Sequence, residues 1–85
     1  MAVTAIIVPG AVTAGDAIDL PAGMPEIGEI VSATIVTVDF GGTTLSTASA
    51  TATKESATSF SLDTNVTATD IVILVYVPVT EYVEP

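Results

Sequence analysis

The sequence predicts a small all-β protein, an antiparallel β-sandwich or barrel that forms a single domain over residues 1–85 and has a long central hairpin. Thr, Val and Ile dominate the chain, and β-branched side chains favour the pleated strand over the helix. No window shows the 3.6-residue period of an amphipathic helix over three turns. Turn-forming residues recur at short intervals, which is typical of sandwiches and barrels built from short antiparallel strands.

The turn residues divide the N-terminal third into two strands. The first strand is expected over residues 3–8, and Pro9-Gly10 ends it. A short strand or turn at residues 16–20 leads into the loop 21–25. Two prolines and a glycine in that loop interrupt any ladder of backbone hydrogen bonds.

Two long strands, residues 29–40 and 43–54, are expected on either side of Gly41-Gly42, the clearest turn in the chain. Asn65 belongs to a later turn, and we interpret it as a turn residue although it opens a glycosylation triplet. Beyond the hairpin we expect a shorter strand at residues 58–62, the turn that contains Asn65 at residues 63–65, and a final apolar strand at residues 71–79.

A two-residue Gly41-Gly42 loop predicts the register of the hairpin. In this register Glu29 lies opposite Lys54, the only cation in the chain. The opposite charges support the register independently of the loop. We therefore expect one hairpin from Glu29 to Lys54. The expected pairs are Phe40 with Thr43, Val38 with Leu45, Thr37 with Ser46, Val36 with Thr47, Ile35 with Ala48, Thr34 with Ser49, Ala33 with Ala50, Ser32 with Thr51 and Val31 with Ala52.

Two apolar surfaces of the expected strands are candidates for contact with a partner. The last strand is apolar on both sides, as in a strand covered on both faces; the alternative is a sandwich-core strand with a partly exposed outer face. One hairpin face is lined by alanines; the alternative there is a bend or bulge that turns one continuous core face. The candidate interface residues are Ile73, Val75 and Val77 of the last strand, Ala48, Ala50 and Ala52 of the hairpin, Ile6 of the first strand and Tyr82 of the tail.

The high hydrophobic content of this small chain also bears on whether a partner covers its surface. Hydrophobic residues make up 49% of the 85 residues. A domain of this size buries only about 60–65% of the surface that its unfolded chain exposes. We therefore expect either that apolar side chains lie exposed on the surface or that a partner covers them.

Composition argues against catalysis. The chain has no Cys and no His, so disulfides are excluded and nothing activates its many hydroxyl groups. The closest acid pairs, Asp16 with Asp19 and Glu26 with Glu29, lie in loop or strand contexts and are interpreted as solvated acids. We expect no enzymatic activity and no cofactor. A cation shared by carboxylates around a symmetry axis stays open.

The charge of the chain argues against nucleic acid and anionic membranes as partners. Lys54 stands against ten carboxylates, which gives a formal net charge of −9. Nothing in such a chain neutralises nucleic-acid phosphates or attracts an anionic membrane. No apolar run approaches the roughly 20 residues of a spanning helix. The N-terminal residues also lack the basic start of a signal peptide, so we expect synthesis and use without secretion by that route.

The chain as a whole resembles the small decoration (cement) proteins of tailed bacteriophage heads, which are short, acidic, cysteine-poor β-proteins rich in Thr, Val and Ala. The likeness rests on stretches such as IVSATIVTVDFGGTTL and DIVILVYVPVTEYVEP. It implies a non-enzymatic virion structural protein, made in the host cytoplasm, that decorates and stabilises a capsid shell. Its implied partners are the major capsid protein and further copies of itself, as a homotrimer or other homo-oligomer.

A second resemblance gives the alternative. The run TATDIVILVYVP resembles the penultimate strand of immunoglobulin-like domains, where an Asp precedes a Tyr. It implies an immunoglobulin-like β-sandwich that serves as a binding or adhesion module. Asp70 and Tyr76 are six residues apart rather than four, and no Cys or Trp accompanies them, so a tyrosine corner is not carried over.

Overall fold

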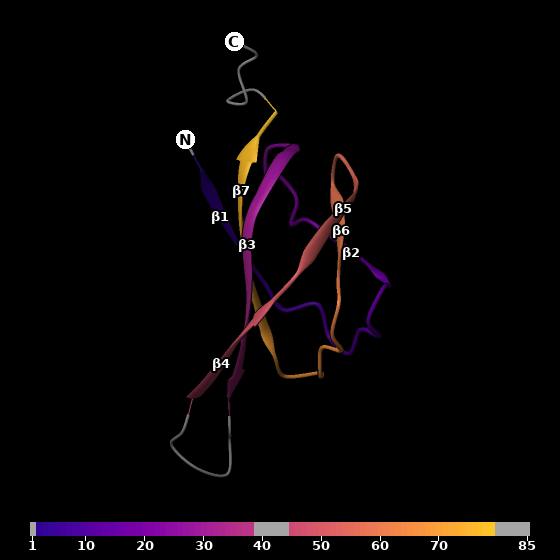
Figure 1. Cartoon of the computed structure of the whole chain (residues 1–85), viewed down its shortest axis with the longest axis vertical. Coiled ribbons are helices and arrows are strands. Elements are labelled where there is room, and N and C mark those ends of the chain that lie inside the picture. Colours follow the sequence, from indigo (N-terminus) through magenta and orange to yellow (C-terminus); the bar gives the residue numbers. More distant parts are fainter. Residues whose placement is uncertain (1, 39–44, 80–85) are drawn as a thin grey trace.

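A computed structural model describes residues 2–38 and 45–79, which form seven strands (Figure 1). The strands make two antiparallel sheets, one with the order β1-β7-β3-β4 and one with the order β2-β6-β5. The all-β prediction is confirmed, and of its two alternatives the structure is the sandwich and not a closed barrel. The strands are β1 (Val3–Ile7), β2 (Ala17–Asp19), β3 (Ile27–Val38), β4 (Leu45–Ala50), β5 (Ala52–Ser56), β6 (Ser59–Leu62) and β7 (Ile71–Pro78).

β7 is one of the two central strands of the four-stranded sheet. It pairs with β1 on one edge and with β3 on the other. Its side chains alternate strictly between buried and half-buried positions, and Val72, Leu74 and Tyr76 are completely buried. The expectation of a central last strand is confirmed. Its inner face belongs to the core, and its outer face is only partly shielded.

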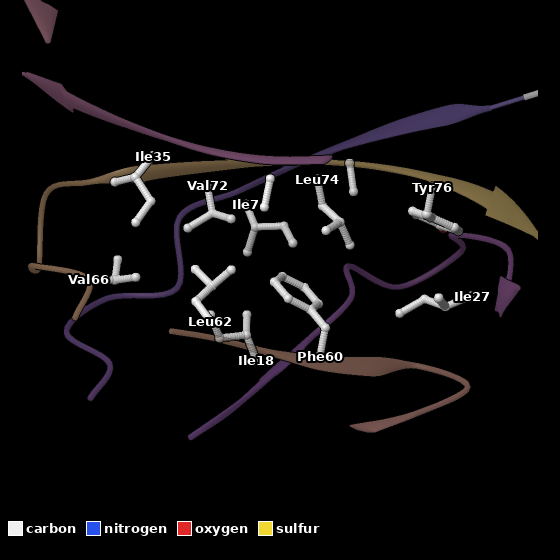
Figure 2. Packing of buried hydrophobic residues seen from close by; sticks show 12 residues of the cluster. Ile7, Ile18, Ile27, Ile35, Phe60, Leu62, Val66, Val72, Leu74 and Tyr76 are labelled. Carbon is white, nitrogen blue, oxygen red and sulfur yellow. The ribbon is translucent and has the colours of Figure 1, made fainter. Parts of the chain in front are cut away.

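The core lies between the two sheets (Figure 2). Phe60, Leu62 and Ile18 of the smaller sheet point toward Val72 and Leu74 of the larger sheet. Full burial of a large apolar side chain stabilises the fold by about 1.5–3 kcal/mol. Contacts of this kind hold together two sheets that share no ladder of hydrogen bonds.

Tyr76 also fixes the loop at residues 21–25. Its hydroxyl donates a hydrogen bond of 2.6 Å to the carbonyl oxygen of Pro25. Burial raises the pKa of Tyr76, because the charged phenolate would lose its hydration. The ring and its hydroxyl thus connect the core to the segment that enters β3.

The predicted register of the β3–β4 hairpin is confirmed near its closed end. Six consecutive pairs match the expectation, from Val38 with Leu45 to Ala33 with Ala50. The Gly41-Gly42 loop itself, with the flanking Phe40–Thr43 pair, lies outside the described residues.

Farther from the loop the expected pairing is wrong, because the chain leaves the larger sheet at Thr51. Glu29 pairs instead with Val77, and Lys54 pairs with Phe60. The second arm of the expected hairpin is therefore two strands in different sheets. Three expected pairs are therefore not formed: Glu29 with Lys54, Val31 with Ala52 and Ser32 with Thr51.

The cause of this divergence lies at a corner held by Asp63. The Thr51 amide donates to Asp63 Oδ1 at 3.0 Å, and the Asp63 amide donates to the Thr51 carbonyl at 3.1 Å. The register of β3 against β7 also shifts twice, at the extra residues Gly28 and Val31. Bulges of this kind increase the local twist and bend a strand. The two arms therefore separate where the corner and the bulges act together.

For the alanine-lined hairpin face, the structure shows the alternative of a bend that turns one continuous core face. Ala50 stands on the near side of the corner and Ala52 on the far side, and both are partly buried against the same core. One continuous core face thus passes from β4 into β5.

Asn65 acts within a second corner, where the segment after β1 meets the segment after β6. Val12 and Val66 exchange both backbone hydrogen bonds, at 2.9 and 2.8 Å. The side-chain oxygen of Asn65 accepts a hydrogen bond from the Ala14 amide at 2.8 Å. Its interpretation as a turn residue fits this arrangement.

A candidate interaction face on the four-stranded sheet

The outer face of the four-stranded sheet is made by the residues that alternate with the buried ones. On β7 these are Ile71, Ile73, Val75 and Val77, which lie between the buried Val72, Leu74, Tyr76 and Pro78. The strand registers add outward residues from the other three strands. We call this set the outer face: Thr4 and Ile6 of β1, Ile71, Ile73, Val75 and Val77 of β7, Glu29, Val31, Ser32, Thr34 and Val36 of β3, and Leu45, Thr47 and Ser49 of β4.

Bulky apolar side chains are exposed on this side of the molecule. Among the described residues, five large hydrophobic side chains are strongly exposed, from 46% for Val79 to 66% for Ile6. Ile6, Val31 and Leu45 belong to the outer face, and Val8 and Val79 continue the alternation just past the ends of β1 and β7. Scattered exposed hydrophobics are ordinary, but a set gathered on one face marks an interaction surface.

Charged side chains avoid the same face. Within the described residues, Glu29 is its only ionisable member, at the end where it pairs with Val77. The other charged residues of ranges 2–38 and 45–79 lie on the smaller sheet, in loops or in turns. A partner that covers the outer face therefore desolvates methyl and hydroxyl groups, which costs less than the desolvation of ions. In these two ranges the charged residues away from the outer face are Asp16, Asp19, Glu26, Lys54, Glu55, Asp63 and Asp70.

Four of the candidate interface residues come together on the outer face. Ile6 lies directly opposite Ile73 across the β1–β7 ladder. Val75 and Val77 continue the same row along β7, and all three β7 side chains are half-buried. Sequence alternation was sufficient to find this group.

None of the three candidate alanines lies on the outer face: Ala48 and Ala50 lie on the inner side of the larger sheet, and Ala52 lies in β5 of the smaller sheet. Ala48 and Ala50 are paired with Ile35 and Ala33, whose side chains are in the core. Ala50 and Ala52 pack partly against that core, whereas Ala48 is exposed. The alanines therefore do not extend the outer face. Tyr82, the last candidate, lies outside the described residues.

Two strongly exposed hydrophobic members of the outer face were not among the candidates. Val31 is 59% exposed because the bulge places it beside Ser32, between the inward-facing Ile30 and Ala33. Leu45 is 65% exposed at the start of β4. Simple alternation could have assigned Leu45 to this face, but the bulge at Val31 left no signal in the sequence.

Asp70 is the one deeply buried carboxylate within the described residues. The Thr67 amide donates to its Oδ2 at 3.0 Å, while Oδ1 has no hydrogen-bond partner. The Thr67 amide holds the pKa of Asp70 below its usual value, against the opposing effect of burial. The Asp70 amide also donates to the Thr67 carbonyl, so this residue closes the turn that leads into β7.

The acid pairs considered above do not form a site. Asp16, Asp19, Glu26 and Glu29 are all exposed. Within residues 2–38 and 45–79, no cluster of three or more acidic, His or Cys side chains could hold a metal ion. The same residues include no helix long and apolar enough to cross a membrane.

An open groove of about 380 Å³ lies between the end of β1 and β2. Its lining is almost entirely aliphatic, and Asp19 is its single charged residue. A small-molecule site normally combines such a lining with several polar groups that converge on the ligand. The groove lacks that convergence and is a weaker candidate than the outer face.

Together the fold and this face define a small two-sheet β-sandwich with a neutral, partly apolar outer surface. No protein-family model matches the chain, and no curated protein or solved structure is significantly similar to it. Its strand order also differs from the constant-type immunoglobulin sandwich, in which strands 1, 2, 5 and 4 face strands 3, 6 and 7. The strand order of this chain is therefore not that of the constant-type immunoglobulin sandwich.

Proposed function

We propose that this protein is a non-enzymatic structural component of a virion, which decorates and stabilises a capsid shell through its outer face and acts as an oligomer. One observation supports it above the others. A strongly acidic chain keeps one sheet face almost free of charge and exposes bulky apolar side chains there. The overall likeness to phage decoration proteins supplies the particular kind of partner, the major capsid protein.

The size of the outer face supports the oligomeric part of the proposal. Four strands about 4.8 Å apart, with roughly six residues each at about 3.3 Å, span roughly 19 by 20 Å, or about 400 Å² in projection. A stable interface needs about 800 Å² on each partner. One copy therefore offers about half of such an interface. Copies joined to one another bind a lattice more tightly, because each later contact is intramolecular.

Binding of this kind stabilises the shell by mass action, because the protein binds assembled subunits and not unfolded ones. Removing apolar area from water contributes about 25 cal/mol per Å². The scarcity of cations in the chain is compatible with a position outside the particle, away from packaged nucleic acid.

The alternative function, a binding or adhesion module, has less support. Carbohydrate recognition normally uses exposed aromatic side chains. Within the described residues the aromatic side chains are Phe60 and Tyr76, and both are completely buried in the core.

Immunogold electron microscopy tests the proposed function. An antibody against the purified protein is applied to intact virus particles from infected cells that express it. We expect gold on the outer surface of the shells. Particles that carry no label, while the protein is abundant in the same lysate, would contradict the proposal.

A pair of variants tests the role of the outer face. Ile6→Asp places a charge at a side chain that is 66% exposed, so the fold should tolerate it while shell labelling falls at least tenfold. Thr53→Asp makes the same addition on β5, on an exposed side chain of the other sheet, and should leave labelling unchanged. Equal labelling for both variants would exclude the outer face as the contact surface.

A further inference from the structure

β4 has the least support from its own chain of any strand in the larger sheet. It is an edge strand, and β3 is its only hydrogen-bonded neighbour. Five of its six residues are exposed, which means that both of its faces are open. Figure 1 shows β4 extending away from β2, β5 and β6. The strand therefore presents two faces and a row of free backbone amides and carbonyls to a partner.

The smaller sheet protects its edges against such a partner. β5 carries Lys54 and Glu55, and its register against β6 is broken between Lys54 and Ser56. β2 is only three residues long and ends in Asp19. Short length, charges and bulges are the usual devices that prevent one edge strand from pairing with another.

β4 has none of these devices. Its sequence LSTASA contains no charge and no proline, and its register with β3 runs without interruption through six pairs. Residues 40–53 contain no ionisable side chain at all. β1 is the other edge of this sheet, but Pro9 follows it closely and Asp19 lies in the groove beside its end. β4 is therefore the more accessible edge.

We propose that β4 pairs antiparallel with β4 of a second copy of this chain, across a twofold axis perpendicular to the sheet. The occupant is a second copy because an uncharged edge is complementary to an identical edge, and β4 brings into the contact no carboxylate of either chain, each of net charge −9. Identical strands that pair antiparallel create a closed, self-complementary dimer. The result is one eight-stranded sheet that spans both copies.

The geometry of the sheet limits the register of this pair. Residues opposite each other in an antiparallel ladder point to the same face. The twofold axis must therefore pass beside a residue that pairs with the identical residue of the second copy. Near the middle of β4 that residue is Thr47 on the outer face or Ala48 on the other face. Both side chains are small and uncharged, and neither opposes a like charge.

The dimer deepens the proposed function, and it rests on that function only for what the joined face binds. Pairing through β4 places the two outer faces side by side on one continuous sheet. The combined face then approaches the area that a stable interface requires. Dimerisation itself can be measured without any shell.

Cysteine crosslinking gives the direct test, because the chain has no cysteine of its own. Thr47→Cys or Ala48→Cys places two thiols beside the axis, within reach of a disulfide. We expect at least one of them to form a covalent dimer rapidly under mild oxidation, on a non-reducing gel. Thr4→Cys on β1 and Thr53→Cys on β5 are the controls and should crosslink at least tenfold more slowly. Crosslinking at Thr4 alone, or equal rates at all four positions, would overturn the proposal.

An edge-blocking variant gives a second, independent test by sedimentation equilibrium. The wild type is expected to be a dimer at about 100 μM, and Thr47→Lys is expected to raise the dimer dissociation constant at least tenfold. Lysine lowers the net negative charge, and the weaker repulsion between the two copies would by itself lower the dissociation constant. Thr53→Lys makes the same charge change on the protected edge and should have no effect. A monomeric wild type, or an unchanged Thr47→Lys dimer, would show that β4 does not pair. Shells labelled by that protein would still support the proposed binding to the capsid shell.

Discussion

Replacement of Gly28 by alanine tests the close approach of β3 and β7 at the first bulge. A Cβ added at Gly28 would lie 2.6 Å from the carbonyl oxygen of Val77 and 3.0 Å from the carbonyl carbon of Pro78. Both contacts are with backbone atoms, which cannot rotate away as a flexible side chain would. The two strands would have to separate locally.

Two opposing effects decide the sign of the Gly28→Ala change. Alanine restricts the unfolded chain and would stabilise an unstrained site by about 0.4–1 kcal/mol. Forcing an extra carbon into a filled space costs about 1–3 kcal/mol. The steric effect is the larger one, so we expect a net loss of about 1–2 kcal/mol in the free energy of unfolding. For a domain of this size each kcal/mol shifts Tm by about 4–8 °C.

Thermal unfolding followed by circular dichroism measures this loss. Tm of Gly28→Ala should fall by roughly 4–16 °C. Ser32→Ala is the matched control, because Ser32 is exposed in the same strand and its replacement should change stability by less than about 0.5 kcal/mol. An unchanged or higher Tm for Gly28→Ala would show that β3 and β7 do not approach each other this closely.

The remaining predictions concern three side chains that hold turns and loops. Asp63→Ala should lower the unfolding free energy by about 0.5–1.5 kcal/mol in urea titrations, because the Thr51 amide loses its acceptor, while Asp63→Asn should keep more of it. Tyr76→Phe should cost a similar amount, since the Pro25 carbonyl loses its hydroxyl donor. Because its folded pKa is lowered, Asp70 contributes stability that is fully present at neutral pH and is lost as the pH falls below its ordinary value of 3.8 through the folded pKa. Asp70→Asn should remove that part of the acid dependence; an unaltered acid profile would show that the Thr67 contact does not set the pKa.

Local patterns were enough to predict the parts of the fold that depend on neighbouring residues. Alternation and the Gly41-Gly42 loop fixed six β3–β4 pairs, because a two-residue loop leaves only one register for the strands beside it. The same alternation identified Ile73, Val75 and Val77 as one row of the outer face.

The prediction failed where distant residues decide the structure. The register past Ala50 depends on Asp63, which captures the Thr51 backbone from twelve residues away. The bulges at Gly28 and Val31 depend on the pairing of β3 with β7, which lies even farther along the chain. The apparent match of Glu29 with Lys54 was a coincidence of counting. For the same reason the alanines were assigned to an interface although two of them pack against the core.

The central position of β7 has a consequence for the order of events during biosynthesis. β7 is the last of the described strands along the chain, yet β1 has no hydrogen-bonded partner in the sheet without it. While the ribosome is still adding β7, the described strands can form only the β3–β4 hairpin and the smaller sheet β2-β6-β5. The sandwich must therefore close after most of the chain has emerged, by pairings between residues distant in sequence, which form slowly. During that interval β1 has no strand to pair with, and unpaired apolar strands are prone to misassembly.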